Sequence, residues 1–247
     1  MGRITSVSDI RQLGTILGVW AHPDDETFTS AGIMTAAVRN GQEVICVTAT
    51  KGERGMQDES KWPAHQLANV RKIELEAALK TIGVKKHHWL DFKDNCCDEA
   101  GQDGVLCICE LIDTYQPDTI LTFGHDGMTG HDDHKAVCMW AVEAQKRTNH
   151  SAIVYHAVIT KEQHNEGLDS LDKKLNIFFN LSSPNLVGES DCHICFRLTP
   201  ELQDIKCAAL QAMPSQTTRM FEEFGKDVVC DALSTEAFVK ANNKTNA

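Results

Sequence analysis

Short apolar runs alternate with longer amphipathic stretches through the first two-thirds of the chain. The short runs are mostly continuous, which is typical of strands buried in a parallel sheet, and they cover 15–20, 43–50, 87–92, 118–123 and 153–158. Between them, apolar residues recur every three to four positions, which predicts helices at 27–40, 65–82, 104–115 and 132–146. Gly41 and Gly83 stand where the first two helices are expected to end.

This alternation predicts right-handed βαβ units and therefore an α/β fold, with a mostly parallel sheet and helices on both faces. The pattern weakens after residue 160. We expect an irregular C-terminal third, with an edge strand at 193–198 and a helix at 200–212. Because no flexible linker, repeat or charge block separates two parts, the sequence predicts a single domain over 1–247.

Composition agrees with a globular protein and narrows its partners. Hydrophobic residues make up 42% and charged residues 24% of the 247 residues, and the net charge is −11. A surface this negative argues against nucleic-acid binding. No apolar run reaches the roughly 20 residues that a membrane span needs, and the first 13 residues have no signal-peptide core. We therefore expect a cytoplasmic protein.

The ten cysteines are expected to be reduced thiols in that compartment. Cys192 and Cys195 have CxxC spacing, but a structural zinc site usually needs two such pairs, so a second metal site is not expected. Cys96 and Cys97 lie in a polar stretch, where we expect exposed and oxidisable thiols.

Two clusters of histidines and carboxylates follow two of the expected strands. Residues 21–26 come directly after the first strand, and residues 125–134 follow the strand that ends at Phe123. Ligands of open parallel sheets bind beyond the carboxyl ends of the strands. A mixed set of imidazole and carboxylate groups suits zinc or iron with one open position, and a surplus carboxylate provides a general base.

The same residues have other interpretations. Asp132 and Asp133 stand at a helix start, where an Asp commonly caps the helix. A dinucleotide site is disfavoured, because no Gly-x-Gly-x-x-Gly follows the first strand, and neither a Walker loop nor a Gly-x-Ser-x-Gly turn is found. From chemistry alone, His125, His131 and His134 are equal candidates for a third metal ligand.

Four segments in order resemble one known family. Ala-His-Pro-Asp-Asp-Glu at 21–26 is similar to the signature of the LmbE-like, or PIG-L, metal-dependent N-acetylglucosaminyl de-N-acetylases, which have a Rossmann-like fold. Residues 130–134, 50–55 and 71–75 resemble further motifs of that family, and Ser215-Gln216 is a weaker echo. The similarity covers most of 14–160.

The resemblance implies a role for each matching residue. The metal, Zn²⁺ with Fe²⁺ or another divalent ion as the alternative, would be bound by His22, Asp25 and His134. Asp24 would be the general base. His131 would lie near the developing oxyanion or the leaving amine, in a protonated form, with Asp133 orienting it.

Substrate hydroxyl groups would be bound, by the same resemblance, by Glu53, Arg71 and Asp94. Arg71 and Glu74 have an ordinary alternative as an exposed ion pair on a helix. Two positions depart from the family pattern. Asp132 replaces the usual Pro and would add negative charge near the metal, and Met213 stands near the place of a usual His in the wall that covers the substrate.

The expected function is hydrolysis of the N-acetyl group of an N-acetylglucosamine-type sugar or glycoconjugate, a small substrate, by a metal-activated water. The alternatives are an amidase acting on a thiol-sugar conjugate and a non-catalytic sugar-binding relative. The presence of Asp24 argues against the latter, because a binding protein needs no base. The sequence leaves the oligomeric state open, and a homo-oligomer is compatible with it.

Overall fold

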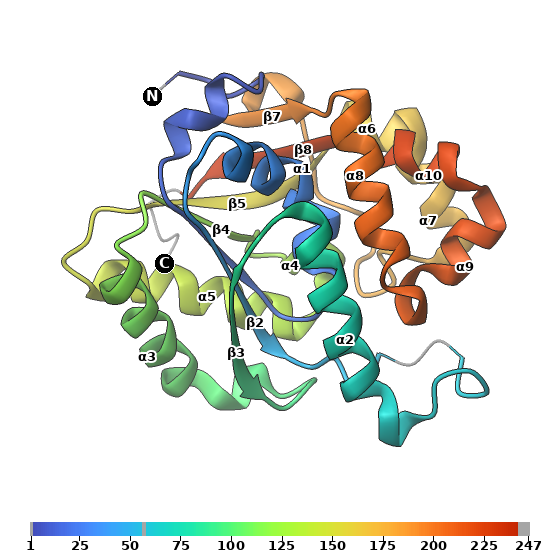
Figure 1. Ribbon diagram of the computed structural model, residues 1–247, viewed down its shortest axis with the longest axis horizontal. Coiled ribbons are helices and arrows are strands. Elements are labelled where there is room, and N and C mark those ends of the chain that lie inside the picture. Colours follow the sequence, from blue (N-terminus) through green and yellow to red (C-terminus); the bar gives the residue numbers. More distant parts are fainter. Residues whose placement is uncertain (1, 56–57, 242–247) are drawn as a thin grey trace.

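The computed structural model describes residues 2–55 and 58–241, and the polar stretch 57–64, which the sequence predicts to be a loop, begins outside them at Gln57. In the described chain, eight strands form a sheet in the order β3-β2-β1-β4-β5-β8-β7, with β6 beside β5 (Figure 1). The strands are β1 (Ile16–Trp20), β2 (Val44–Thr50), β3 (Lys86–Phe92), β4 (Thr119–Phe123), β5 (Ile153–Thr160), β6 (Leu186–Val187), β7 (Ile194–Arg197) and β8 (Thr235–Lys240).

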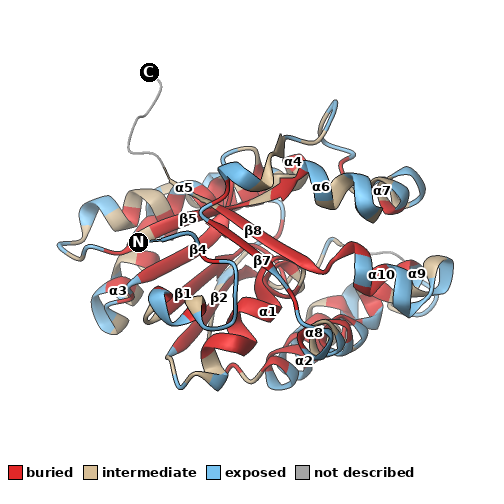
Figure 2. Cartoon of the chain, turned by 90° about the horizontal axis from the view of Figure 1, so that it is seen from above, coloured by how far each residue is buried: buried red, intermediate tan, exposed pale blue. Residues whose placement is uncertain are grey.

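Helices cover both faces of the sheet, as the alternating pattern predicted. The described helices are α1 (Asp25–Arg39), α2 (Ala64–Ile82), α3 (Cys97–Tyr115), α4 (Gly127–Gly130), α5 (Asp132–Arg147), α6 (Lys161–Gln163), α7 (Asp169–Leu175), α8 (Pro200–Gln211), α9 (Pro214–Phe224) and α10 (Lys226–Ala232). Helices α1, α2 and α8 pack against one another, while α3 packs against α5. Figure 2 shows that the central strands are buried between these layers.

The first five strands are parallel, and their order changes direction between β1 and β4. Every residue of β1 and β4 is buried, which explains why both read as continuous apolar runs. The two ionisable clusters follow these two strands. They therefore meet at the point where the strand order reverses, which is the usual ligand site of an open α/β sheet.

The C-terminal third is more regular than expected. The expected edge strand is confirmed as β7, and the helix at 200–212 as α8. The sequence pattern missed β8, which inserts antiparallel between β5 and β7, and it missed α9 and α10. Strand β8 pairs with β5 about eighty positions earlier in the chain, and a local pattern carries no information about such a partner.

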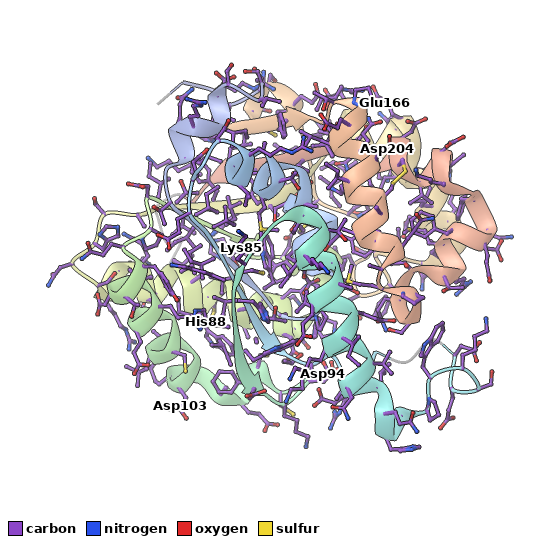
Figure 3. All side chains as sticks on the ribbon, in the orientation of Figure 1. Lys85, His88, Asp94, Asp103, Glu166 and Asp204 are labelled. Carbon is purple, nitrogen blue, oxygen red and sulfur yellow. A yellow bond between two sulfur atoms is a disulfide. The ribbon has the colours of Figure 1, made fainter. Side chains whose placement is uncertain are left out.

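Two expectations about the cysteines were wrong. Cys207 and Cys230 form a disulfide that joins α8 to α10, seen as a yellow bond beside Asp204 in Figure 3. Their Cα atoms are 5.9 Å apart, within the range that a disulfide spans. Cys97 is buried because α3 begins there rather than at residue 104, with a kink at Gly101. The other eight cysteines are free thiols.

The CxxC pair is part of a small apolar cluster. Cys192 and Cys195 are both buried and pack with Ala237. Within residues 2–55 and 58–241, no helix combines the length and the apolar character that crossing a membrane requires.

Candidate metal centre and adjoining cleft

His22 and His134 face each other at the carboxyl ends of β1 and β4. The Nδ1 atom of His134 donates a hydrogen bond to the carbonyl oxygen of Gly127 over 2.9 Å, which leaves its Nε2 as a lone pair. The Nε2 atom of His22 donates to carboxylates of Asp133 and Asp94, each over 3.1 Å, which leaves its Nδ1 as a lone pair. The two lone-pair nitrogens are 3.1 Å apart. Two acceptors this close require a cation between them.

Asp25 completes this arrangement. Its carboxylate oxygens lie 3.6 Å from Nδ1 of His22 and 3.3 Å from Nε2 of His134. Ligands placed tetrahedrally at about 2.1 Å from a zinc ion are about 3.4 Å from one another. The His22–His134 separation therefore matches the spacing of two ligands around one divalent metal, and Asp25 lies at a similar distance from each nitrogen through a different oxygen, so the donors present fit such an ion.

The charges in this cluster are strongly coupled. Burial alone would raise the pKa of Asp25, but His134 and His22 hold it at about 2. Burial lowers the pKa of His134 to about 4. Burial also opposes protonation of His22, yet hydrogen bonds to Asp133, Asp25 and Asp94 raise its pKa well above the ordinary value. In the absence of a metal, a proton on His22 is the cation that this cluster takes up.

His131 lies at the rim of the cluster. His22, His131 and His134 form one group in the described structure with the spacing of metal ligands, and His22, Asp94 and Asp133 form another. His131 caps the start of α5, because the backbone N–H of Asp133 donates to its Nδ1 over 3.1 Å. Nδ1 therefore carries no proton, and the neutral His131 ring has its proton on Nε2. Burial also lowers the pKa of His131. The expected protonated ring is therefore disfavoured.

Asp133 contacts a different histidine from the one expected. Its carboxylate accepts hydrogen bonds from the backbone N–H groups of Asn95 and Cys97 and lies against Nε2 of His22. It therefore orients His22, and only its backbone contacts His131. A carboxylate behind a ligating histidine is the usual outer partner in metal sites.

Asp24 lies beside the cluster in a strained conformation. It precedes α1 with φ 115°, a region that residues with a side chain rarely adopt. Its backbone N–H donates to the buried carboxylate of Glu26, and its own carboxylate lies 3.1 Å from Arg71. Burial raises the pKa of Asp24 to about 7, and the Arg71 guanidinium opposes the rise. Strain of this kind is concentrated at functional sites.

The three residues expected to bind substrate hydroxyl groups also have partners within the protein, and their role toward substrate stays a prediction. Arg71 is buried and donates to the carbonyl oxygens of Gly52 and Pro23. Asp94 is also buried, and Figure 3 shows it near the lower end of α2. It accepts from the backbone of Arg54, while Glu53 accepts from the backbone of Asp94. The Nε atom of Arg71 is buried without a hydrogen-bond partner in the described structure, and none of the three residues lines the cleft described below.

Other sequence-based expectations also changed. Glu74 and Arg71 are both buried, so they are not an exposed pair, and Glu74 accepts hydrogen bonds from Ser215. Asp132 points to solvent with 84% of its side chain exposed and pairs with Lys135, so its charge is directed away from the cluster. His125 packs against His156 and Cys138 and takes no part in the metal-ligand groups.

A cleft of about 800 Å³ opens beside the cluster, with Asp24, Asp25 and His134 on its wall. Trp62, in the loop before α2, and Gln216, in the Ser-Gln echo, also line it. Sequence reasoning missed Thr129, Phe28 and the residues of the C-terminal third on this wall. Thr129 stands inside the second motif and Phe28 lies two residues after the first, whereas the residues of the C-terminal third carry no local signal because they come from distant segments.

Comparison with known proteins agrees with this site. The profile of the PIG-L family, GlcNAc-PI de-N-acetylase, matches residues 17–145, just over half of the chain. A 1D-myo-inositol 2-acetamido-2-deoxy-alpha-D-glucopyranoside deacetylase of Saccharomonospora viridis is 26% identical over 228 residues, covering 82% of this chain and 85% of its own. One from Saccharopolyspora erythraea is 27% identical and covers 89% and 84%.

Solved structures share the fold at lower identity. The N,N'-diacetylchitobiose deacetylase of Pyrococcus horikoshii aligns with a TM-score of 0.65 and 22% identity, over 94% of this chain and 85% of its own. The zinc-inhibited teicoplanin deacetylase Orf2 aligns with a TM-score of 0.64 and 15% identity, over 93% and 100%. The 4-carboxy-2-hydroxymuconate hydratase GalB of Pseudomonas putida aligns with a TM-score of 0.64 and 16% identity, over 95% and 98%.

The hydratase shows that this fold alone does not define a reaction, so the assignment rests on the matched family and its motifs. The match over residues 17–145 contains both strand-end clusters. The two deacetylases named above extend the similarity over 82% and 89% of the chain. The chain belongs to the PIG-L family of de-N-acetylases.

Proposed function

We propose that this de-N-acetylase hydrolyses the acetamide of an N-acetylglucosamine-type sugar, with zinc held by His22, Asp25 and His134. The observation that carries the proposal is the pair of lone-pair nitrogens 3.1 Å apart, beside the Asp25 carboxylate and on the wall of an open cleft. Deacetylase relatives named for acetamido sugars support the substrate class. Iron(II) is the alternative metal, because the same ligands suit it.

A divalent metal bound there lowers the pKa of a water molecule and polarises the amide carbonyl. The residues of the chain supply the remaining chemistry. Asp24 lies on the wall of the cleft and, with a pKa of about 7, accepts the proton of the attacking water near neutral pH. Asp133 and Asp94 fix the orientation of His22, and the Gly127 carbonyl fixes that of His134.

The departing amine must receive a proton, and Asp24 is a better donor of this proton than His131. Neutral His131 carries a proton on Nε2, which it can donate as a hydrogen bond to the developing oxyanion without transferring it. Asp24 gains a proton during attack and returns it to the nitrogen as the C–N bond breaks. This route leaves both side chains in their starting states.

The strained backbone of Asp24 argues against a non-catalytic sugar-binding relative, because a protein that only binds has no reason to hold this residue at φ 115°. An amidase acting on a thiol-sugar conjugate remains the second candidate. The ratio of kcat/KM for an N-acetylated sugar and for a cysteinyl-sugar amide distinguishes the two.

Two substitutions test the assignment. Asp24→Asn should retain zinc at full stoichiometry and lose turnover by about a hundredfold or more, because the shape remains and the base is removed. His134→Ala should lose zinc affinity, measured by metal analysis after dialysis. Asp132→Asn is the matched control, since its exposed side chain should affect neither quantity. Near-native turnover of Asp24→Asn would exclude the proposed base.

A further inference from the structure

Asp24 stands at the N-cap position of α1 without capping the helix. An Asp at this position usually accepts hydrogen bonds from the first free N–H groups of the helix, but the Asp24 side chain makes no such bond. Its carboxylate lies beside Arg71 and on the wall of the cleft instead. Its backbone has φ 115° and ψ −32°, which residues with a side chain rarely adopt. Another group has to hold this backbone in place.

Glu26, in the first turn of α1, contacts that backbone directly. Its Oε2 atom accepts a hydrogen bond from the backbone N–H of Asp24 over 3.1 Å. In a capping box, a Glu or Gln three positions after the N-cap residue reaches back to the same N–H group, and the N-cap side chain bonds in return. Glu26 reaches back from two positions, and only this half of the box is formed. The Asp24 side chain is therefore left free for the cleft.

The rest of Glu26 is fixed by the same turn of the helix. Its second carboxylate oxygen, Oε1, accepts a hydrogen bond from the hydroxyl group of Thr27. Its backbone carbonyl oxygen accepts one from Oγ of Ser30 over 3.0 Å. These contacts come from within α1, so the position of Oε2 beside Asp24 is set by the fold before any substrate binds.

The burial of Glu26 indicates a purpose beyond packing. Its side chain has no exposed surface, and among the described residues its oxygens accept from Asp24 and Thr27 but form no ion pair with a lysine or arginine. Burying a carboxyl group without a cationic partner lowers stability, which an apolar side chain of similar length would avoid. Such departures from good packing are expected at functional sites. Glu26 lines neither the cleft nor the metal-ligand groups of the described chain, so it can act on the reaction only through Asp24.

We propose that Glu26 is a positioning residue, whose Oε2 atom holds the backbone of Asp24 at φ 115° and thereby directs the Asp24 carboxylate into the cleft. The inference rests on the function proposed above, in which Asp24 is the base. It makes the reach of the side chain at position 26 more important than its charge. Gln has an oxygen at the same distance from the backbone, whereas Asp retains the charge but is one methylene shorter.

Three variants of the full chain separate reach from charge, with kcat and KM measured by amine release from methyl N-acetylglucosaminide. Glu26→Gln should retain kcat within about threefold, because its oxygen still accepts from Asp24. Glu26→Asp and Glu26→Met, which lack an acceptor at that place, should each lose about a hundredfold in kcat, since a small displacement of a reacting group has that effect. KM and zinc stoichiometry should stay unchanged, because the cleft wall and the proposed ligands are intact.

A matched control and a structural measurement complete the test. Ser30→Ala removes a buried hydrogen bond from the same turn but leaves the N–H of Asp24 bonded, so its kcat should equal that of the unaltered enzyme. Crystal structures of the variants report on Asp24 without relying on turnover. The φ angle of Asp24 should stay near 115° in Glu26→Gln and should move to an ordinary negative value in Glu26→Asp.

The outcomes distinguish this inference from the proposed function. An active Glu26→Asp beside an inactive Glu26→Gln would show that charge matters and would overturn the positioning role. Equal kcat in all the proteins, with only lower thermal midpoints, would leave Glu26 a structural residue and would also overturn it. If the unaltered zinc-loaded protein released no amine, the proposed function would fail. The φ angle of Asp24 in Glu26→Asp would then still decide whether Glu26 holds this backbone.

Discussion

At the scale of single residues, the active centre depends on how each polar atom is already engaged. His22 and His134 are ready to bind a cation because their other ring nitrogens are held by carboxylates and by a carbonyl. Asp24 is ready to exchange a proton because burial raises its pKa to about 7. The outer partners, rather than the ligands alone, determine what the site can do.

Arg71 is one such outer partner, and its removal should alter the pH dependence of catalysis. The guanidinium lies 3.1 Å from the Asp24 carboxylate and stabilises its charged form. In Arg71→Met the pKa of Asp24 should rise above about 7, so the acidic limb of kcat/KM should move to higher pH. Arg71→Lys, which retains the charge, should show a smaller shift. A limb that stays in place in Arg71→Met would contradict the electrostatic role.

His156 should make folding stability sensitive to acid. Burial, together with His125, lowers the pKa of this ring to about 4 in the folded chain, against an ordinary value of about 6.5. The unfolded chain therefore binds more protons between these values, and stability present above pH 6.5 is lost as the pH falls toward 4. This single ring accounts for roughly 3 kcal/mol over that range.

Urea unfolding at several pH values measures the effect. His156→Leu should flatten the dependence of the unfolding free energy on pH between 6.5 and 4, whereas His65→Leu, at an exposed position, should leave it unchanged. The conclusion would be wrong if the two variants had the same slope as the unaltered protein.

At the scale of elements, the position of α1 decides where Asp24 and Asp25 lie, because both stand at the start of this helix. A buried ion pair holds the middle of this helix. Lys206 of α8 donates to the carbonyl of Phe28 and to Glu236 of β8, and Glu236 accepts from the backbone of Gly32 and Ile33. The pair therefore connects α1, α8 and β8 around the helix at whose start Asp24 and Asp25 lie.

Removing one partner of this ion pair should lower the unfolding free energy by more than replacing both partners. Lys206→Met leaves the Glu236 charge buried without its partner, which should lower the unfolding free energy by about 3–5 kcal/mol. The double variant Lys206→Met, Glu236→Gln should lose less than the sum of the single losses. Calorimetry or urea unfolding of all four proteins measures the coupling, and strictly additive losses would show that the two side chains act independently.

At the scale of the whole molecule, the C-terminal third completes the wall of the cleft that residues of the first two-thirds begin. Helices α7 and α9 and strand β8 contribute residues to the wall of the cleft beside the metal centre. The Cys207–Cys230 disulfide joins α8 to α10 within the same region. A disulfide and part of the cleft wall thus both lie in the segment with the weakest sequence pattern.

The disulfide should add measurable stability. It closes a loop of 23 residues, and chain entropy assigns to such a loop about 3 kcal/mol. Dithiothreitol should lower the thermal midpoint of the unaltered protein, and the double variant Cys207→Ser, Cys230→Ser should start at that lower midpoint and not respond. Equal midpoints for the oxidised protein and the variant would show that the bond contributes nothing.

The sequence by itself determined the parallel α/β core and the two clusters at its strand ends. Both depend on local signals: apolar runs buried on two faces, and ionisable residues placed directly after them. The resemblance then proposed His22, Asp25 and His134 as ligands with Asp24 as the base, and the observed spacing of the three proposed ligands is compatible with that set.

Only the tertiary structure decided which groups are engaged and which are free. It placed buried Arg71 beside Asp24 and buried Asp94 beside His22, contacts that the motifs do not report. It paired Lys206 with Glu236, and Cys207 with Cys230, across separations that no local pattern reports. It also brought together the residues that line the cleft, which come from distant segments of the chain. Such contacts depend on the packing of remote elements, and periodicity along the chain contains no record of them.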